Sequence, residues 1–306
     1  MINFRDYKRV RMCTHGRTES ATGHSAGHFD DWICRVAAGK FGWDSERLDD
    51  LSEASVIAWL SNDPSTLNII CDFIYVPDPK FPNLLIFDHH DPCRPTQKCS
   101  AHQLMEELVR QGLMREVPAL MQEISAWDVL GPNSIPIENR PDPDRYMSVL
   151  AAEPEGGFDR KTAEFILMML ERSFSIRQFV NELFESETKL GENARRIHSE
   201  ILAKREEALA EITRTAAVSE SPSGVRYATL DKNPAGLLRE IFSRLGVDIV
   251  IHPNERTTNA VSVVRDSNGR YATMPVSELV EVAKDQVVFT HPGGFLLVAY
   301  PPVIVK

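Results

Sequence analysis

Cysteine is scarce and unpatterned in this chain. The five cysteines among 306 residues form no Cys-x-x-Cys pair, and their number is odd. A disulfide framework needs paired cysteines, and a zinc ribbon needs closely spaced ones, so the sequence indicates neither. Scattered cysteines of this kind are typical of a reducing compartment, and we expect a cytoplasmic protein.

Basic charge and long apolar runs are also lacking. The 34 Lys and Arg residues are outnumbered by 44 Asp and Glu residues, which gives a formal net charge of -10. This balance argues against broad binding to duplex nucleic acid, which needs many phosphate contacts from Lys and Arg. A small phosphorylated substrate stays compatible with it, because a bound metal ion can reverse the local field. No run reaches the roughly 18 apolar residues of a membrane span, and the first residues lack signal-peptide order, so we expect no membrane association.

What the chain does contain is an apolar run that ends abruptly in an acid and two histidines. The segment Leu84-Leu85-Ile86-Phe87 is followed by Asp88-His89-His90. Four large apolar residues without polar alternation favour a central strand of a parallel sheet, and ligands bind beyond the carboxyl ends of such strands. Carboxylate and imidazole groups together suit manganese, zinc or iron. A helix N-cap Asp beside two surface histidines would give the same pattern.

Two further acids stand where apolar segments end. Asp72 interrupts the apolar run over 67–76, and Asp128 ends a helix predicted over 117–127. A buried acid costs several kcal/mol unless it is paired, caps a helix or binds a metal ion. An Asp at a helix C-terminus is disfavoured by the helix dipole. Both acids are therefore candidate functional residues, and Asp72 and Asp88, which end neighbouring strand candidates, favour a shared site.

A polar loop near the N-terminus adds a second set of metal-ligand residues. A strand candidate over 9–14 is followed by this loop and then by a helix that starts near Asp30. The spacing His24-x-x-x-His28-x-Asp30 lets one loop wrap an ion between the strand end and the helix start. An ordinary polar loop with a capping Asp remains the alternative.

The candidate polar residues are more numerous than one ion requires. They are His24, His28, Asp30, Asp72, Asp88, His89, His90 and Asp128. We therefore predict a two-metal site, in which two ions about 3.5–4 Å apart share a bridging carboxylate and a bridging water. Such ions lower the pKa of the water to give hydroxide at neutral pH, and they neutralise charge that grows on a phosphoryl oxygen.

The second half of the chain changes character. Helical spacing over 192–217 predicts a long helix, and the segments that follow predict a small α/β domain. We expect a parallel-sheet α/β catalytic domain over 1–190, joined by this helix to a smaller α/β domain over 191–306. The turn Asp266-Ser267-Asn268-Gly269 predicts a type I′ hairpin between strands over 260–265 and 271–274.

Two other local patterns bear on the site. A helix over 100–109 is predicted to begin at Ser100 as N-cap, with Gln103 in the capping-box position. Gly293 and Gly294 precede a strand over 294–300, where backbone amides without a Cβ nearby can approach an anion. An ordinary tight turn explains the glycine pair equally well.

The ordered motifs resemble the DHH phosphoesterase superfamily, which includes family II pyrophosphatases, RecJ-type exonucleases and oligoribonucleases. The resemblance is carried by His24-x-x-x-His28-x-Asp30, Asp72, Asp88-His89-His90 and Asp128. Within the superfamily, the chain is most similar to the melanocyte-proliferating-gene-1 exonuclease group. This similarity rests on Gly27-His28-Phe29-Asp30-Asp31, Asp78-Pro79, Cys99-Ser100-Ala101, Trp127-Asp128 and the segment 289–295. It runs over nearly the whole chain in the right order.

The resemblance implies a role for each matching residue. One metal ion would be held by Asp30, Asp72, His89 and Asp128, and the second by His24 and His28 with Asp72 bridging. Asp88 would orient His89, and His90 would meet the substrate phosphate. The resemblance implies substrate contacts from the second domain by His291, Gly293, Gly294 and Arg256.

The first motif departs from the family pattern. The usual histidine directly follows the first strand, and His15 stands there in Cys13-Thr14-His15-Gly16, with Arg17 to Ser25 inserted after it. His15 satisfies the placement next to the strand, whereas His24 satisfies the ligand spacing. We favour His24, because local spacing sets metal geometry.

The sequence therefore predicts a divalent-metal-dependent phosphodiesterase, with Mn²⁺ as the main candidate ion and Mg²⁺ as the alternative. We expect a short single-stranded oligonucleotide or a nucleotide as substrate, with 3′-to-5′ exonuclease action as one form of the activity. A pyrophosphatase or phosphomonoesterase using the same site is the first alternative. The second is a binding protein that kept the fold and lost the chemistry. Assembly into a homo-oligomer is left open by the sequence.

Overall fold

The structure is a computed structural model of the chain. It describes residues 2–19, 25–48, 53–72, 81–90, 96–234, 236–254, 259–291, 294–299 and 303–306. For Thr18, Glu19, Ser25, Glu53, Pro132 and His291 only the backbone is described. Contacts divide the chain into two compact units: residues 1–17, 27–129 and 135–196 form the first, and residues 18–26, 130–134 and 197–306 form the second.

A four-stranded parallel sheet forms the centre of the first unit. Its strands, in the order β4-β1-β5-β6, are β4 (Asp44–Leu48), β1 (Arg9–His15), β5 (Thr66–Cys71) and β6 (Leu84–Phe87). All three neighbouring pairs run parallel. Every residue of β5 is buried, as expected for a strand covered on both faces. The prediction of a parallel sheet that contains the 84–87 segment is confirmed. Its prediction as a central strand is wrong for the residues that the structure describes, because β6 is the last strand in the order and Leu84, Leu85 and Ile86 are only half-buried.

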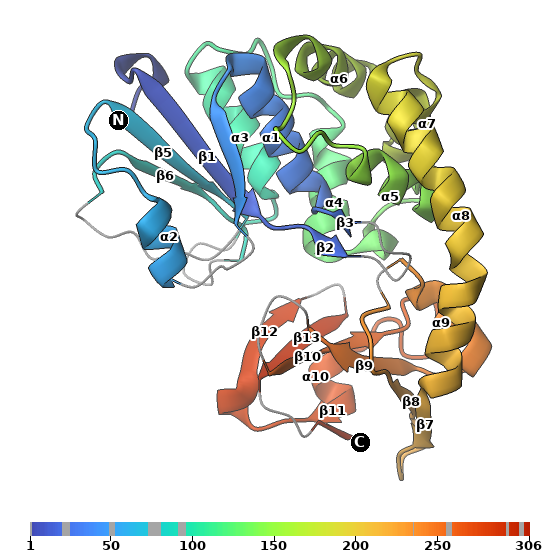
Figure 1. Cartoon of the computed structure of the whole chain (residues 1–306). Helices are drawn as coiled ribbons and strands as arrows, with labels where there is room; N and C mark the ends of the chain where they lie inside the picture. The colour runs from blue at the N-terminus through green and yellow to red at the C-terminus, as the bar shows by residue number, and fades with distance from the viewer. Residues whose placement is uncertain are drawn as a thin grey trace. The chain divides into compact units, whose positions relative to one another are not determined.

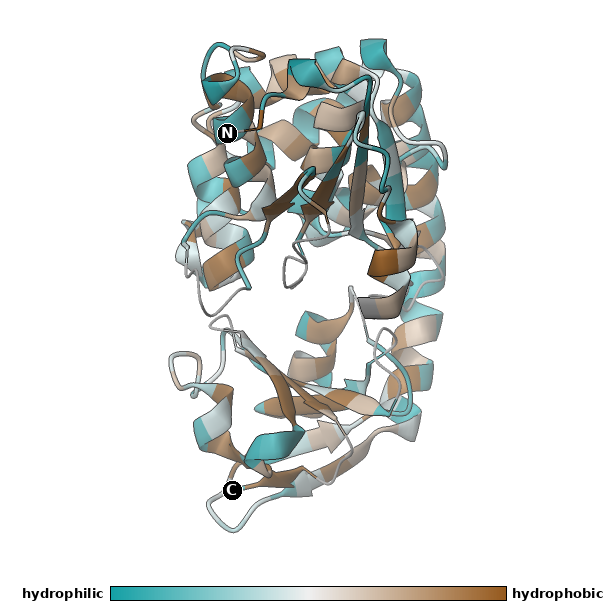
Figure 2. Cartoon of the chain, turned by 90° about the vertical axis from the view of Figure 1, so that its left-hand side faces the viewer, coloured by the Kyte–Doolittle hydropathy of each residue, from teal (hydrophilic) through white to brown (hydrophobic). Residues whose placement is uncertain are grey.

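Helices cover both faces of this sheet (Figure 1). Helices α1 (Phe29–Phe41) and α3 (Ser100–Arg110) pack together on one face, and α2 (Glu53–Trp59) lies on the other. The acids Asp30 and Asp31 occupy the first turn of α1, where the helix dipole favours negative charge, and Gly42 ends the helix in the left-handed conformation with φ 66°. Figure 2 shows the apolar colouring of the strands between these layers.

The remaining regular elements described in the first unit are helical. They are α4 (Met121–Leu130), α5 (Pro143–Ala151), α6 (Arg160–Arg172) and α7 (Ile176–Glu185), with the short 3-10 turns η1 (Phe4–Asp6) and η3 (Ile137–Asn139). A third 3-10 turn, η2 (Pro132–Ser134), is assigned to the second unit. Helix α6 packs directly on α1. The long helix α8 (Lys189–Thr215) follows, which confirms the predicted long helix. It begins in the first unit and ends in the second.

The second unit contains a six-stranded sheet in the order β12-β13-β10-β9-β8-β7. These strands are β7 (Ala217–Glu220), β8 (Arg226–Thr229), β9 (Ile249–Pro253), β10 (Ala260–Arg265), β12 (Val287–His291) and β13 (Phe295–Ala299). Only β8 and β9 pair in parallel. The remaining elements are α9 (Leu238–Leu245), α10 (Val276–Leu279), η4 (Lys284–Gln286), the pair β11 (Val280–Glu281) with β14 (Ile304–Val305), and the pair β2 (Thr18–Glu19) with β3 (Ser25–Ala26). A smaller α/β unit after the long helix was predicted, and this is confirmed.

The predicted hairpin after residue 265 is wrong. Residues 271–274 form turns, and β10 pairs with β9 and β13 instead. The Asp266 side chain accepts a hydrogen bond from the Asn268 backbone N–H at 2.9 Å, and neither Asn268 nor Gly269 has the positive φ that a type I′ turn requires. The Arg265 guanidinium donates to the carbonyls of Tyr271 and Met274, which holds this segment as a turn.

Two details of the predicted helices also differ. Cys99, not Ser100, is the N-cap of α3, and the Gln103 side chain donates to the carbonyls of Asp88 and Lys98 instead of closing a capping box. The helix predicted over 117–127 runs from Met121 to Leu130. The predicted domain boundary at 190/191 falls inside α8 and stays a prediction. Among the helices that the structure describes, none is long and apolar enough to cross a membrane.

One close approach in the first unit is open to a stability test. A Cβ added at Gly39, in α1, would overlap the backbone carbonyl oxygen of Phe158. We expect Gly39→Ala to lower the free energy of unfolding by about 1–3 kcal/mol, because overpacking must displace backbone there. Gly156→Ala is the matched control, since an added Cβ meets nothing within 4 Å. Equal stability of the two variants in thermal unfolding by circular dichroism would contradict the packing of α1 against this segment.

Candidate metal centre

Histidines and acids gather at the carboxyl edge of the parallel sheet. Strand β1 ends at His15, Asp72 directly follows β5, and Asp88 directly follows β6. Because parallel neighbours end at the same edge, these side chains come close together although they lie far apart in sequence. Helix α1 begins at the same edge, so its first turn adds two more acids.

Asp72 lies at the middle of this group. Its side chain is fully buried, and its Oδ2 is 3.3 Å from Nδ1 of His28 and 3.5 Å from Nδ1 of His15. Its other oxygen, Oδ1, is 3.3 Å from Nδ1 of His89 and 3.6 Å from Nδ1 of His90. Four imidazoles thus surround one carboxylate, two on each oxygen. This is the arrangement expected of a carboxylate that bridges two cations.

The backbone of Asp72 is unusual as well. Its φ is 62°, in the left-handed region that non-glycine residues rarely occupy. Cys71 ends β5 in regular parallel pairing with Phe87, so the left-handed residue directly terminates the strand. Strained residues of this kind persist where the surrounding structure fixes them, and they cluster at functional sites.

Three groups of potential ligand atoms meet at Asp72. Within each group the ligand atoms lie within 4.8 Å of one another. The groups are His15, His28, Asp31 and Asp72; Asp30, Asp72, His89 and Asp128; and Asp72, Asp88, His89 and His90. Asp72 is common to all three groups, so they are overlapping parts of one centre, and the second and third groups also share His89.

The first group contains two residues that the favoured sequence prediction did not include. His15 Nδ1 is 3.9 Å from Oδ2 of Asp31, and the rings of His15 and His28 meet edge to face at 5.4 Å between centroids. His24, which the spacing argument favoured, lies outside the described residues. The placement of His15 directly after the first strand was the sequence signal for it. Asp31 follows Asp30 in the first helical turn, and it entered the sequence prediction only as part of the 27–31 motif, without a ligand role.

The second group joins α1, α4 and the turn after β6. His89 Nε2 lies 3.3 Å from Oδ2 of Asp128, and Asp128 sits in the last turn of α4. Asp30 is completely buried in the first turn of α1. Its ligand atom, with those of Asp72, His89 and Asp128, completes a set of three carboxylates and one imidazole.

Asp88 contacts a different histidine from the one expected. The resemblance implied that Asp88 supports His89. In the structure, Oδ1 of Asp88 is 2.9 Å from both the backbone nitrogen and Nδ1 of His90. Ser100 also differs from its predicted capping role, because its hydroxyl donates to Oδ1 of Asp72 at 3.5 Å.

Crowding of buried carboxylates shifts their proton affinities. Burial raises the pKa of Asp72 well above its usual value, and the negative charges of Asp30 and Asp31 raise it further. Burial likewise raises the pKa of Asp128, again with repulsion from Asp30 and Asp31. The pKa of Asp30 rises to about 6 through burial, although backbone N–H groups and the charge of His90 oppose the rise. Burial alone would raise the pKa of Asp88 too, but hydrogen bonds from His90 outweigh it and lower the value.

The donor set fits divalent cations. Neither oxygen of the buried Asp30 makes a hydrogen bond of normal geometry to the residues that the structure describes. Buried carboxylates normally have well-formed partners, so oxygens with so little hydrogen bonding suit a cation from outside the chain. Carboxylate oxygens with imidazole nitrogens are a donor set for manganese, zinc or iron. A cation among these carboxylates would also offset the repulsion that helps to raise the pKa values of Asp72 and Asp128.

The predicted substrate residues lie in the second unit and are only partly described. Gly293 and Arg256 lie outside the described residues, and of His291 only the backbone is described, at the end of β12. Gly294 has φ 97°, and a Cβ placed on it would lie 2.7 Å from Nη2 of Arg265. Gly294 therefore packs against a buried guanidinium that sequence reasoning missed, because Arg265 looked like the end of a hairpin strand.

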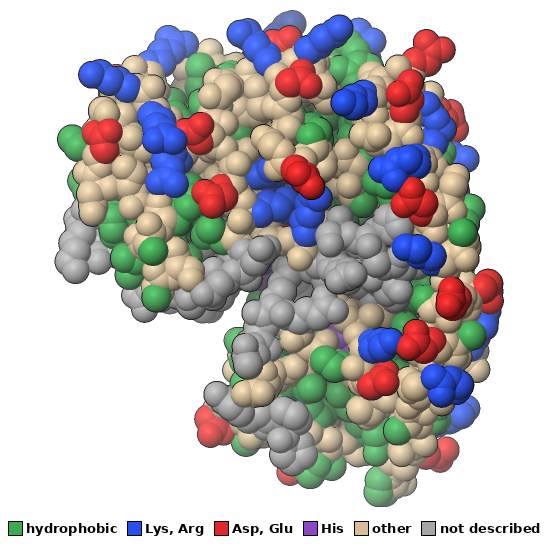
Figure 3. All heavy atoms as spheres, in the orientation of Figure 1, with side chains coloured by type: hydrophobic (Ala, Val, Ile, Leu, Met, Phe, Trp, Pro, Cys, Tyr) green, Lys and Arg blue, Asp and Glu red, His purple; other side chains and the backbone are tan. Residues whose placement is uncertain are grey.

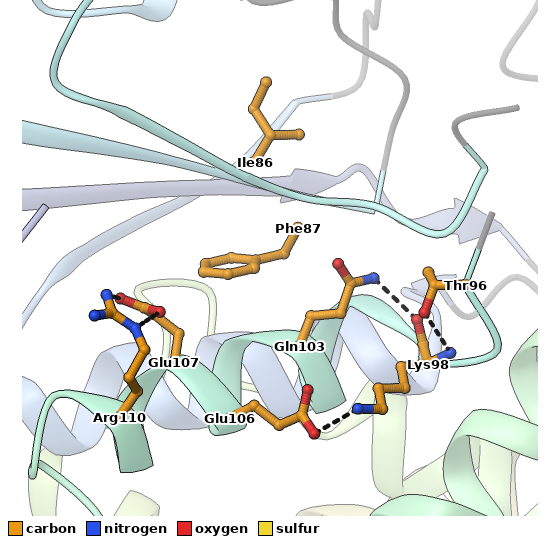
Figure 4. Close-up of a pocket in the computed structure, with 8 residues that line it drawn as sticks. All are labelled: Ile86, Phe87, Thr96, Lys98, Gln103, Glu106, Glu107 and Arg110. Atoms are coloured by element: carbon orange, nitrogen blue, oxygen red, sulfur yellow. Dashed lines mark hydrogen bonds and ion pairs between the residues drawn. The ribbon is translucent and has the colours of Figure 1, made fainter. Parts of the chain in front are cut away.

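A pocket of the first unit is separate from this centre (Figure 4). It has a volume of about 500 Å³ between β6 and α3. Lys98, just before α3, pairs with Glu106 at 2.6 Å, and Arg110 pairs with Glu107 three residues earlier in α3. None of its eight lining residues belongs to the metal-ligand groups, and its charges neutralise one another. It offers no arrangement for acid–base or metal chemistry.

Comparison with known proteins gives remote structural likeness. No protein-family model and no curated protein matches the chain. A pGpG-specific phosphodiesterase, PggH from Vibrio cholerae, has a TM-score of 0.43 at 15% identity and covers 95% of this chain and 94% of its own. RecJ from Thermus thermophilus in complex with Mn²⁺ has a TM-score of 0.41 at 12% identity, covering 95% of this chain and 49% of its own. An exopolyphosphatase-related protein from Bacteroides fragilis has a TM-score of 0.40 at 10% identity, covering 98% and 89%. Likeness this remote leaves the function to be argued from the chain's own residues.

The burial of the Asp30 carboxyl predicts that folding stability and metal binding oppose each other at this residue. A carboxyl whose pKa is about 6 in the folded chain and 3.8 unfolded loses folding stability as pH rises from about 4 to 6 and stays destabilising above that. In metal-free protein at pH 7.5, we expect Asp30→Asn to raise the free energy of unfolding by about 1–3 kcal/mol and to flatten this pH dependence.

The same variant is expected to lose the stabilisation that added Mn²⁺ gives the wild type. Thermal unfolding with EDTA and with Mn²⁺, at pH 5 and 7.5, measures both effects. The exposed Glu171→Gln is the matched control and should change neither. If metal-free Asp30→Asn were less stable than the metal-free wild type at pH 7.5, the claim that the buried Asp30 carboxylate destabilises the fold would be wrong.

Proposed function

We propose that this chain is a divalent-metal-dependent phosphoesterase of the DHH type, acting on small nucleotides or short oligonucleotides. The observation that carries the proposal is the buried Asp72 carboxylate, with two imidazoles facing each of its oxygens. The ordered motifs of the sequence support the same superfamily. The narrower resemblance to the melanocyte-proliferating-gene-1 exonuclease group stays a prediction.

In this proposal the two ligand groups hold two ions that share Asp72. His15, His28 and Asp31 hold one ion, and Asp30, His89 and Asp128 hold the other. We assign His15 rather than His24 to the first ion on its distance of 3.5 Å from Asp72. Mn²⁺ is the expected ion, because it accepts both imidazole and carboxylate ligands, whereas Mg²⁺ prefers oxygen ligands and retained water.

Such ions, when bound, supply Lewis acidity that activates a water molecule and neutralises charge on a phosphoryl group. The chain's own residues would position the substrate beside them. Oδ1 of Asp88 lies 2.9 Å from Nδ1 of His90 and so fixes the orientation of this imidazole beside Asp72. His90 is therefore the residue that we assign to the substrate phosphate, with Asp88 as its support.

The charge distribution favours a small substrate. On the face shown in Figure 3, acidic and basic side chains are interspersed among the described residues, without one broad basic area. A long duplex would need such an area, whereas a short strand or a nucleotide needs only local contacts. We propose that Gly294, backed by Arg265, contributes such contacts with His291, Gly293 and Arg256 from the second unit.

Removing a ligand from one ion tests the site. We expect Asp128→Ala to lower kcat/KM of Mn²⁺-dependent hydrolysis by more than about 100-fold, because one ion loses a carboxylate ligand. The exposed Glu164→Ala is the matched control and should keep wild-type activity. Circular dichroism of both proteins checks that the fold persists. Full activity of Asp128→Ala would remove this residue, and the ligand group that includes it, from the proposal.

The products distinguish phosphodiesterase action from the alternatives. With Mn²⁺ present, we expect release of mononucleotides from a short single-stranded oligonucleotide, followed by chromatography. Phosphate release only from pyrophosphate or from monoesters would instead support the pyrophosphatase or phosphomonoesterase reading at the same site. Metal binding without turnover of any of these substrates would support a binding protein that has lost the chemistry.

A further inference from the structure

Glu153 is a buried acid that the proposed chemistry does not use. It follows α5 in the first unit, and its side chain has no solvent exposure. An ionised carboxylate in such a place costs several kcal/mol unless cations pair with it. Glu153 is therefore not an ordinary surface charge, and the residues around it must stabilise its carboxylate.

Three arginines from separate elements converge on Glu153. Nε of Arg35, from α1, donates to Oε1, and Nη2 of Arg47, from β4, donates to Oε2. Arg17, just after β1, donates through Nη2 to the Glu153 backbone carbonyl at 2.9 Å and lies 3.8 Å from Oε2. One carboxylate thus ties together the first helix and two strand ends of the catalytic sheet.

Arg47 extends this network to the ligands of one ion. Its Nη1 donates to the backbone carbonyl of His15 at 3.0 Å. Its guanidinium also lies against Gly27, where an added Cβ would overlap it. Gly27 directly precedes His28, so a single side chain contacts the backbone beside both imidazoles that face Oδ2 of Asp72.

The charge balance of the network matters for a nearby cation. Three guanidinium groups share one buried carboxylate, and burial together with repulsion from Arg47 and Arg35 lowers the pKa of Arg17, which Glu153 opposes. Positive charge beside the His15–His28 group disfavours a cation there, and the effect is larger in a poorly solvated region than in water. Glu153 both orients Arg47 and offsets part of this charge.

We propose that Glu153 is a positioning residue that, through Arg47, holds His15 and His28 and sets the affinity of the ion they bind. The inference rests on the proposed metal centre. It predicts an asymmetric effect: loss of Glu153 weakens the ion of the His15, His28 and Asp31 group. The ion held by Asp30, His89 and Asp128 keeps its affinity, because the contacts of Arg47 lie on the other side of Asp72.

The test is Mn²⁺ binding to the full-length chain, measured by isothermal titration calorimetry and by the free-Mn²⁺ signal in electron paramagnetic resonance. We expect two ions per wild-type chain, and in Glu153→Gln a roughly 10–100-fold weaker affinity for one of them, as is usual when a group supporting a ligand is removed. The exposed Glu164→Gln, which also pairs with an arginine, is the matched control and should bind as the wild type does.

A His28→Ala background identifies the affected ion. If Glu153 acts on the His15–His28 group, Glu153→Gln changes nothing further in a chain that already lacks His28. If Glu153→Gln fails to fold by circular dichroism, Arg47→Lys takes its place: it keeps the positive charge but loses the forked contacts that join Glu153 to the His15 carbonyl, and the same ion is expected to bind more weakly. Wild-type affinity for both ions, or equal weakening of both, overturns the positioning role while the metal centre stands. A wild-type chain that binds no Mn²⁺ overturns the proposed metal centre itself.

Discussion

Repulsion among buried carboxylates at one edge of the parallel sheet is the constraint on which the rest of the site depends. Asp72 is enclosed by other acids and by imidazoles, and burial together with these charges raises its pKa. A folded chain without cations must tolerate this arrangement at a cost in stability. Such a cost is normally retained only where it serves binding or catalysis.

The fold supplies the rigidity that this arrangement requires. Asp72 stands at the end of a fully buried strand, between β1 and β6, whose own ends bear His15 and Asp88. The acids of α1 are fixed by a helix that packs on α3 and α6. Behind them, Glu153 and its arginines connect β1, β4 and α1. Two regions of opposite charge therefore adjoin each other. The carboxylates around Asp72 suit cations, and the three arginines beside them are held together by Glu153.

Sequence patterns predicted much of the fold because they reflect local physics. The apolar run before Asp88 forms a strand of the parallel sheet, although β6 ends the strand order and is mostly half-buried, and the acids at the start of α1 agree with the helix dipole. The long helix α8 has clear helical periodicity. Where prediction was wrong, tertiary contacts decided the outcome. Asp266–Gly269 has the composition of a hairpin turn, but Arg265 binds the carbonyls beyond it and β10 finds other partners. Ser100 has the composition of an N-cap, yet its hydroxyl faces Asp72.

By itself, the sequence determined the residue types of the site and the strand ends on which they stand, because hydrophobic periodicity and turn residues act over a few positions. The distances among those residues were decided by tertiary structure, because they join segments that are far apart in the chain. Only the fold placed His15 and Asp31 beside Asp72, and only the fold turned Asp88 toward His90. The convergence of Arg17, Arg35 and Arg47 on Glu153 has no sequence signature at all, since each arginine alone resembles a surface charge.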